Sequence, residues 1–147
     1  MKTKLLLLIV SLFLAFPAMA QDVEESTLVP DAALQEEDHL VVLWTSRDAD
    51  VAKKMVFMYV YNAKKYAWWK EITFIIWGPS SKLLAEDEGL QEELQKMKEE
   101  GIVLEACKAC ADQYGVSENL KALGVDVKYM GVPLTKYIKS NSHVVTF

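Results

Sequence analysis

From residue 39 onward, short apolar runs alternate with longer stretches in which apolar residues recur at helical spacing. The runs are rich in β-branched and aromatic residues, which favours strands, and they occupy residues 39–46, 71–78, 101–107, 125–131 and 143–147. The first two contain VVLW and ITFIIW and are almost continuously apolar, as expected of strands covered on both faces. We therefore predict five strands, with the first two near the centre of a sheet.

The stretches between these runs predict helices with recognisable ends. The first covers residues 48–65, and the second begins near Ser80 and ends at Gly101. A third begins at the cysteines and is interrupted at Gly115, and the last has Pro133 in its first turn. Strands that alternate with helices imply parallel pairing through right-handed crossovers. The expected fold is an α/β, three-layer α/β/α domain with a five-stranded, mainly parallel sheet, doubly wound like flavodoxin.

The first predicted helix is more apolar than one buried face requires. Residues 55–61, MVFMYVY, are apolar or aromatic at seven consecutive positions, and no helical orientation buries all of them against one sheet. We expect some of them, with Phe57 and Tyr61 among the contact residues, to form a subunit interface in a homo-oligomer. Burial of the whole helix within the monomer's own core is the alternative.

The first twenty residues have the pattern of a secretory signal peptide. Lys2 and Lys4 precede an uncharged apolar run, and Ala18-Met19-Ala20 forms a small-x-small cleavage site. The run is shorter than the roughly 20 apolar residues that a membrane-spanning helix needs. We expect cleavage before Gln21, a periplasmic or secreted protein, and no membrane span after cleavage.

Residues 21–38 carry seven acids and no base, which predicts an acidic, disordered leader before a single domain over residues 39–147. A chain beginning at Gln21 has 14 basic residues against 21 acidic ones, a net charge of −7. We expect no nucleic-acid partner, because binding to phosphates needs a basic surface.

The candidate chemistry lies in the stretch LEACKACADQYG, which holds the only two cysteines of the chain, Cys107 and Cys110. Ligand sites of parallel α/β sheets lie beyond the carboxyl ends of the strands, and Cys107 ends a predicted strand there. A thiol at the start of a helix is favoured as the thiolate, which is the nucleophilic form. Cys110, about one turn further on, is a candidate resolving thiol. The sequence has no GxGxxG, P-loop or Ser/His/Asp order, so the thiols are the candidate nucleophiles.

Over residues 40–147 the sequence resembles the DsrE/DsrF-like sulfur-relay proteins. The resemblance is most specific in LEACKACADQYGVSENLKALGVDVKYMGVPLTKYI, residues 104–138, with the closing strand HVVTF. It implies that Cys107 stands at the position that receives sulfur as a persulfide, with a protein sulfur donor or acceptor as partner. It also implies assembly into trimers or hexamers. The best-known members are cytoplasmic, whereas this chain has the features of an exported one.

Four interpretations of the cysteines remain open: a persulfide carrier of the sulfurtransferase type at Cys107, a CxxC dithiol redox site, a non-catalytic oligomeric binding module, and a metal site. The last is the weakest, because a second cysteine pair is missing and only His39 and His143 supply imidazoles. We assign no cofactor and no metal. Trp68, Trp69 and Trp77 favour core or interface positions over a ligand pocket.

Overall fold

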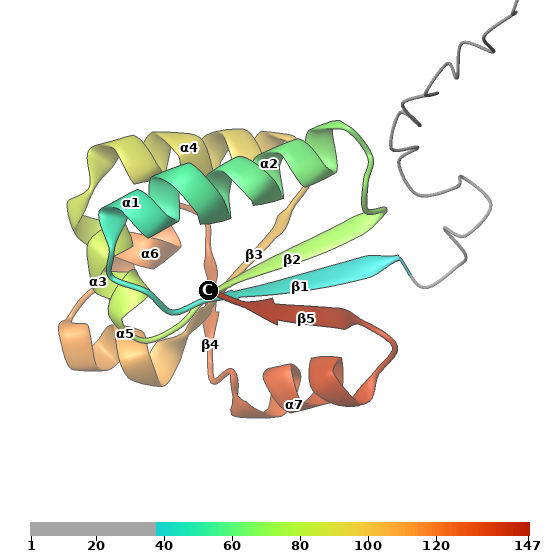
Figure 1. Cartoon of the computed structure of the whole chain (residues 1–147). Coiled ribbons are helices and arrows are strands. Elements are labelled where there is room, and N and C mark those ends of the chain that lie inside the picture. The colour runs from blue at the N-terminus through green and yellow to red at the C-terminus, as the bar shows by residue number, and fades with distance from the viewer. Residues whose placement is uncertain (1–37) are drawn as a thin grey trace, which may run out of the picture. The chain divides into compact units, whose positions relative to one another are not determined.

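The computed structural model describes residues 38–147, which form an α/β domain (Figure 1). The predicted signal peptide and the predicted leader, apart from Asp38, lie outside the described residues. The strands are β1 (His39–Trp44), β2 (Glu71–Ile76), β3 (Val103–Cys107), β4 (Asp126–Lys128) and β5 (His143–Thr146). The helices are α1 (Ala49–Val51), η2 (Ala52–Phe57), α2 (Met58–Lys65), α3 (Pro79–Glu86), α4 (Glu88–Glu99), α5 (Lys108–Tyr114), α6 (Ser117–Ala122) and α7 (Gly131–Lys139).

The five strands form one sheet in the order β4-β3-β2-β1-β5, and every neighbouring pair is parallel. This confirms the predicted fold class, while the strand order differs from that of flavodoxin. From β1 to β4, each crossover places the next strand on the same side of the one before it. The crossover through α7 instead runs back across the sheet and places β5 beside β1, at the opposite edge from β4. Because such crossovers are right-handed, this reversal puts α7 on the other face of the sheet from α2 and α4 (Figure 1).

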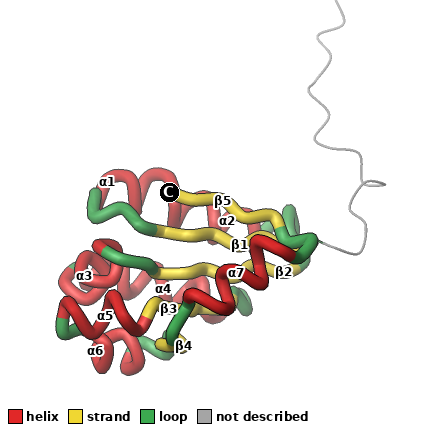
Figure 2. Tube along the Cα trace, turned by 90° about the horizontal axis from the view of Figure 1, so that it is seen from below, coloured by secondary structure: helices red, strands yellow, loops and turns green. Residues whose placement is uncertain are grey.

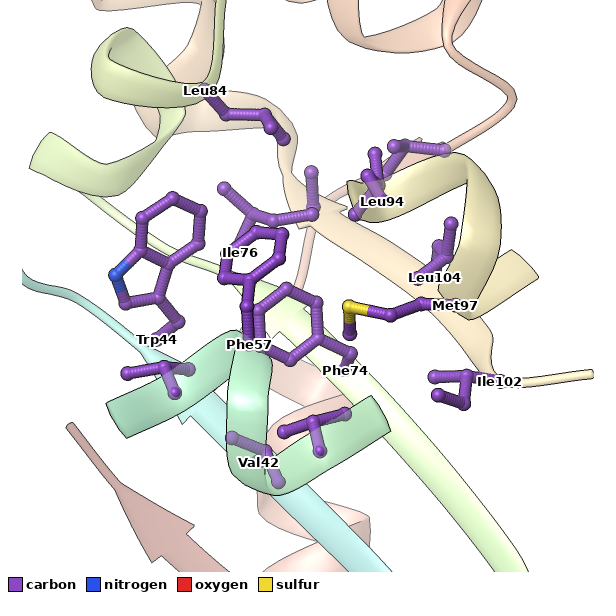
Figure 3. Close-up of a cluster of buried hydrophobic side chains, with 14 of the residues drawn as sticks. Val42, Trp44, Phe57, Phe74, Ile76, Leu84, Leu94, Met97, Ile102 and Leu104 are labelled. Atoms are coloured by element: carbon purple, nitrogen blue, oxygen red, sulfur yellow. The ribbon is translucent and has the colours of Figure 1, made fainter. Parts of the chain in front are cut away.

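The larger part of the core lies between the sheet and the helices η2 to α6. Its centre is an aromatic cluster in which the rings of Trp44, Phe57 and Phe74 lie 5.1–5.9 Å apart (Figure 3). Two of these contacts are edge-to-face and one is stacked, both of which are favourable ring geometries. Aliphatic side chains from α3 and α4, such as Leu84 and Leu94, pack around the cluster.

The first helix contains a π-helical segment, η2, that the sequence pattern did not predict. The wider turn leaves the adjacent residues Val56 and Phe57 both buried, while Met55 and Met58 are 51% and 54% exposed. The placement of Phe57 at a subunit contact was therefore wrong, because this side chain is only 3% exposed and fills the monomer's core. Tyr61 is half-buried, with Lys65 over its ring.

The second predicted helix is two helices. Asp87 adopts an extended conformation that ends α3, and its side chain accepts a hydrogen bond from the N–H of Leu90 at the start of α4. The break predicted at Gly115 is confirmed, since this residue ends α5 with a φ of 68°, a left-handed conformation that glycine adopts without strain. Across residues 38–147, no helix is long and apolar enough to cross a membrane.

Candidate functional site

The two thiols lie where β3 passes into α5, at the carboxyl edge of the sheet. Cys107 is the last residue of the strand and the N-cap of the helix, with an extended backbone (φ −71°, ψ 106°). The strand is buried from Leu104 onward and pairs with β2 and β4 on its two sides. Cys110 lies in the first turn of α5, so the helix geometry brings its side chain back toward Cys107.

The two sulfur atoms are in contact without being bonded. Both cysteines are free thiols, and the Cys110 S–H donates to the Cys107 sulfur across 3.0 Å. Burial and this contact with Cys107 raise the pKa of the Cys110 thiol, so Cys110 keeps its proton to higher pH than an ordinary cysteine. Cys107 is therefore the hydrogen-bond acceptor of the pair.

The loop after β2 contributes a backbone group to the site. The amide of Gly78 hydrogen-bonds the Cys110 sulfur and partly opposes the rise in its pKa. Gly78 has a φ of 71° and a ψ of −132°, a conformation that favours glycine. This geometry brings the loop between Trp77 and α3 next to the thiols, so two loops at the carboxyl edge of the sheet meet there.

Cys107 belongs to a small apolar cluster on the face of the sheet that α7 occupies. It is 4% exposed, and the other fully buried members are Val41, Ile75 and Met130. Partly buried side chains complete the cluster: Leu43, Trp77, Cys110, Leu134, Tyr137 and Val144. The larger core lies on the opposite face. Of the two thiols, Cys110 is thus the more accessible one.

A buried polar network adjoins this apolar cluster. Glu105, on the same face of β3 as Cys107, is 4% exposed, and its Oε1 accepts hydrogen bonds from Lys128 Nζ (2.6 Å) and Tyr137 OH (3.2 Å). Its Oε2 is buried without a hydrogen-bond partner among the described residues. Burial lowers the pKa of Lys128, but its bonds to Asp126 and Glu105 outweigh this and raise the pKa overall. Burial and the charge of Glu105 raise the pKa of Tyr137.

Sequence reasoning found the cysteines and missed their surroundings. Glu105, Lys128 and Tyr137 come from β3, β4 and α7, which are far apart along the chain. One signal was present, because Glu105 is a charged residue within the otherwise apolar strand VLEAC, and buried carboxylates need partners. The contact from Gly78 left no sequence signal beyond the glycine itself.

Of the three candidate tryptophans, Trp77 packs in the Cys107 cluster, whereas Trp68, Trp69 and the histidines lie apart from the thiols. Trp69 lines a groove of about 300 Å³ beside β5 with Tyr59 and His143, and Trp68 is 46% exposed next to it. His39 bonds Thr73 and Ser142 rather than a cysteine. Over the described part of the chain, no group of three or more His, Cys, Asp or Glu side chains is placed to hold a metal ion.

Fold and site together define a small α/β protein with a reduced thiol pair at the carboxyl edge of an all-parallel sheet. The model of the DsrE/DsrF-like family matches residues 38–147, and the chain belongs to this family, as its sequence predicted.

A conserved protein of unknown function from Bacteroides thetaiotaomicron has a similar structure, with 41% sequence identity, a TM-score of 0.73, and coverage of 75% of this chain and 95% of its own. The ychN protein from E. coli shares the fold at 15% identity, with a TM-score of 0.57 and coverage of 76% and 100%. No protein with a curated description matches the chain significantly.

Proposed function

We propose that this protein is a sulfur carrier, in which Cys107 accepts a sulfane sulfur as a persulfide and passes it to an acceptor thiol. Cys110 is the hydrogen-bond donor of the pair. The proposal is supported by membership of a sulfur-relay-type family and by the position of Cys107 at the carboxyl edge of the sheet. The observation that carries it is the S–H of Cys110 donating to the Cys107 sulfur across 3.0 Å.

The transfer step follows from this hydrogen bond. The Cys107 thiolate attacks the outer sulfur of a persulfide or polysulfide donor, an S–S bond forms at Cys107, and the S–S bond within the donor breaks. The electron pair of the broken bond leaves with the donor thiolate, which takes a proton from solvent. In the second step an acceptor thiolate removes the outer sulfur and Cys107 leaves as the thiolate. Cys110 returns its hydrogen bond to that sulfur. Each step exchanges one S–S bond for another, so the cycle needs no external oxidant or reductant.

A dithiol redox role is the second candidate, and the same distance favours it. Sulfur atoms 3.0 Å apart need only a small movement to form a disulfide, whose S–S bond is about 2.05 Å long. In this cycle the Cys110 thiolate attacks the Cys107 sulfur of the persulfide, a disulfide forms, and hydrosulfide leaves. The two thiols lose two electrons and the outer sulfur gains them, so an external dithiol reductant must restore the pair.

Cys110→Ser separates the two roles. Serine preserves a hydrogen-bond donor beside Cys107 but cannot form a disulfide. Reduced wild-type and variant proteins are loaded with inorganic polysulfide, freed of excess, and assayed for sulfide release and for transfer to a small acceptor thiol. If the protein is a sulfur carrier, Cys110→Ser should hold its added sulfur and deliver that sulfur to the acceptor thiol. If the variant loads normally but neither releases sulfide nor transfers sulfur, the redox cycle is the better account.

A further inference from the structure

The buried position of Cys107 raises the question of how a donor reaches it. Cys107 is only 4% exposed, so little of this residue is accessible to a reactant in the described conformation. The opposite face of the sheet is packed by helices that bury many large side chains. On the Cys107 face, α7 alone among the described helices crosses the strands, as the view from below shows (Figure 2). Access from this face therefore requires α7 to move.

Apolar packing holds α7 less firmly than it holds the helices of the other face. None of the nine residues of α7 is fully buried, and Val132 and Ile138 are 67% and 62% exposed. By contrast, α4 buries Leu90, Leu94 and Met97 completely. Elements with little buried apolar surface open at lower free energy than the rest of a domain.

A hydrogen bond compensates for this weak packing. The hydroxyl of Tyr137, near the end of α7, donates to Glu105 Oε1 on the strand that carries Cys107. Lys128 binds the same oxygen and fixes the acceptor. The ring of Tyr137 also meets the ring of His39 edge-to-face at 5.6 Å. Tyr137 therefore joins α7 to the sheet by a polar bond at one end, while Met130 packs into the Cys107 cluster at the other end.

We propose that Tyr137 is a positioning residue that controls entry to Cys107, because its hydrogen bond to Glu105 holds α7 over the thiol. Opening of α7 exposes the Cys107 sulfur to a donor, and reclosing excludes water from the persulfide. This inference deepens the proposed function and rests on that function for its biological role. What it describes, however, is access to the Cys107 thiol and not the sulfur chemistry.

The test measures access directly with an alkylating agent. In a Cys110→Ser background, Cys107 is the only thiol, and its labelling by iodoacetamide in native buffer is followed by mass. Tyr137→Phe keeps the ring and removes the hydroxyl. The change removes the bonds of the hydroxyl to Glu105 and Thr73. Because the loss of even one hydrogen bond of ordinary strength shifts an opening equilibrium about two- to tenfold, Cys107 labelling should accelerate by at least that factor. Tyr66→Phe, which changes a 61% exposed tyrosine outside the Cys107 cluster, is the matched control and should leave the rate unchanged.

Amide hydrogen exchange distinguishes local opening from general weakening. The proposal predicts that Tyr137→Phe accelerates exchange in α7 and leaves α4 unaffected. An unchanged labelling rate, or equal acceleration of exchange in both helices, would overturn it. The labelling needs no sulfur donor, so the proposed function can fail while this inference holds. Conversely, normal sulfur loading with no effect of Tyr137→Phe on labelling would reject this inference alone.

Discussion

At the scale of single residues, the thiol pair shows how one site gives two identical side chains different roles. Cys107 ends a strand and accepts a hydrogen bond, whereas Cys110 lies within a helix, donates that bond and has a raised pKa. The difference comes from backbone position and from the direction of the hydrogen bond between the two sulfur atoms. The amide of Gly78 acts in the opposite direction by lowering the pKa of Cys110.

This effect predicts the outcome of Gly78→Ala. A side chain at a φ of 71° strains the backbone even though no atom lies near the added Cβ, so the loop should shift and withdraw its amide. Loss of the amide should raise the pKa of Cys110 further. The pH at which Cys110 becomes half-maximally reactive toward iodoacetamide should therefore increase. Gly101→Ala, at a φ of 83° with equally open space, imposes similar strain at the opposite end of β3 and serves as the control. If Gly78→Ala and Gly101→Ala shift the pH profile of Cys110 alkylation equally, then backbone strain, and not the Gly78 amide, sets the reactivity of Cys110.

Phe57 provides a second residue-scale prediction. Its ring contacts Trp44 and Phe74 in the centre of the core. Phe57→Ala should lower the free energy of unfolding by about 3–5 kcal/mol, the usual cost of removing a buried phenylalanine ring. Urea denaturation measures this free energy of unfolding. Tyr66→Ala, at an exposed position, should change it by no more than about 0.5 kcal/mol. A Phe57 variant as stable as wild type would place this side chain outside the core.

At the scale of elements, local patterns were sufficient for much of the fold. Apolar runs rich in β-branched residues identified all five strands, and Gly115 and Pro133 marked helix boundaries. Four features escaped prediction for physical reasons. The π-helical turn of η2 depends on packing Val56 and Phe57 together against the sheet. The break at Asp87 depends on one capping bond within a stretch whose composition suits a continuous helix. The strand order and the Glu105 network depend on contacts between distant segments.

Asp87 joins two elements, and its effect on stability should depend on pH. Its side chain caps α4 and pairs with Lys53 of η2 at 2.6 Å, and the bonds to Lys53 and to the N–H of Leu90 lower its pKa below 3.8. A lowered pKa in the folded state contributes stability above the unfolded-state pKa, and this contribution is lost as the pH falls through the folded value.

Asp87→Ala should therefore cost about 0.5–2 kcal/mol at neutral pH, the usual range for an N-cap. Asp87→Asn keeps a capping oxygen and should cost less. Urea unfolding at several pH values checks both expectations. The gap between wild type and Asp87→Asn should close as the pH falls below 3.8, and a gap that stays constant with pH would contradict the role of the charge.

At the scale of the whole molecule, we propose that copies of the chain associate through the outer side of η2 and α2. Met55 and Met58, three residues apart on this helix, are 51% and 54% exposed and supply neighbouring apolar side chains for such a contact. Tyr61 lies half-buried on the same helix. Light scattering should show an oligomer at micromolar concentration, and Met58→Lys should dissociate it. Val132→Lys, on α7, should not. A monomeric wild-type protein would reject the proposal.

The N-terminal signal peptide and cleavage before Gln21 stay predictions of the sequence. They bear on the chemistry, since an oxidising compartment would favour a disulfide between Cys107 and Cys110 over the free thiols of the described structure.

The most direct test of the central claim asks which cysteine holds the transferred sulfur. Lys108 separates the two cysteines, so trypsin places them on different peptides. Reduced wild type, Cys107→Ser and Cys110→Ser are exposed to limiting inorganic polysulfide, blocked with an alkylating agent and digested. The account predicts that one added sulfur atom appears on the Cys107 peptide in wild type and in Cys110→Ser, and that Cys107→Ser gains none. Sulfur gained by Cys107→Ser at the wild-type rate would contradict the account.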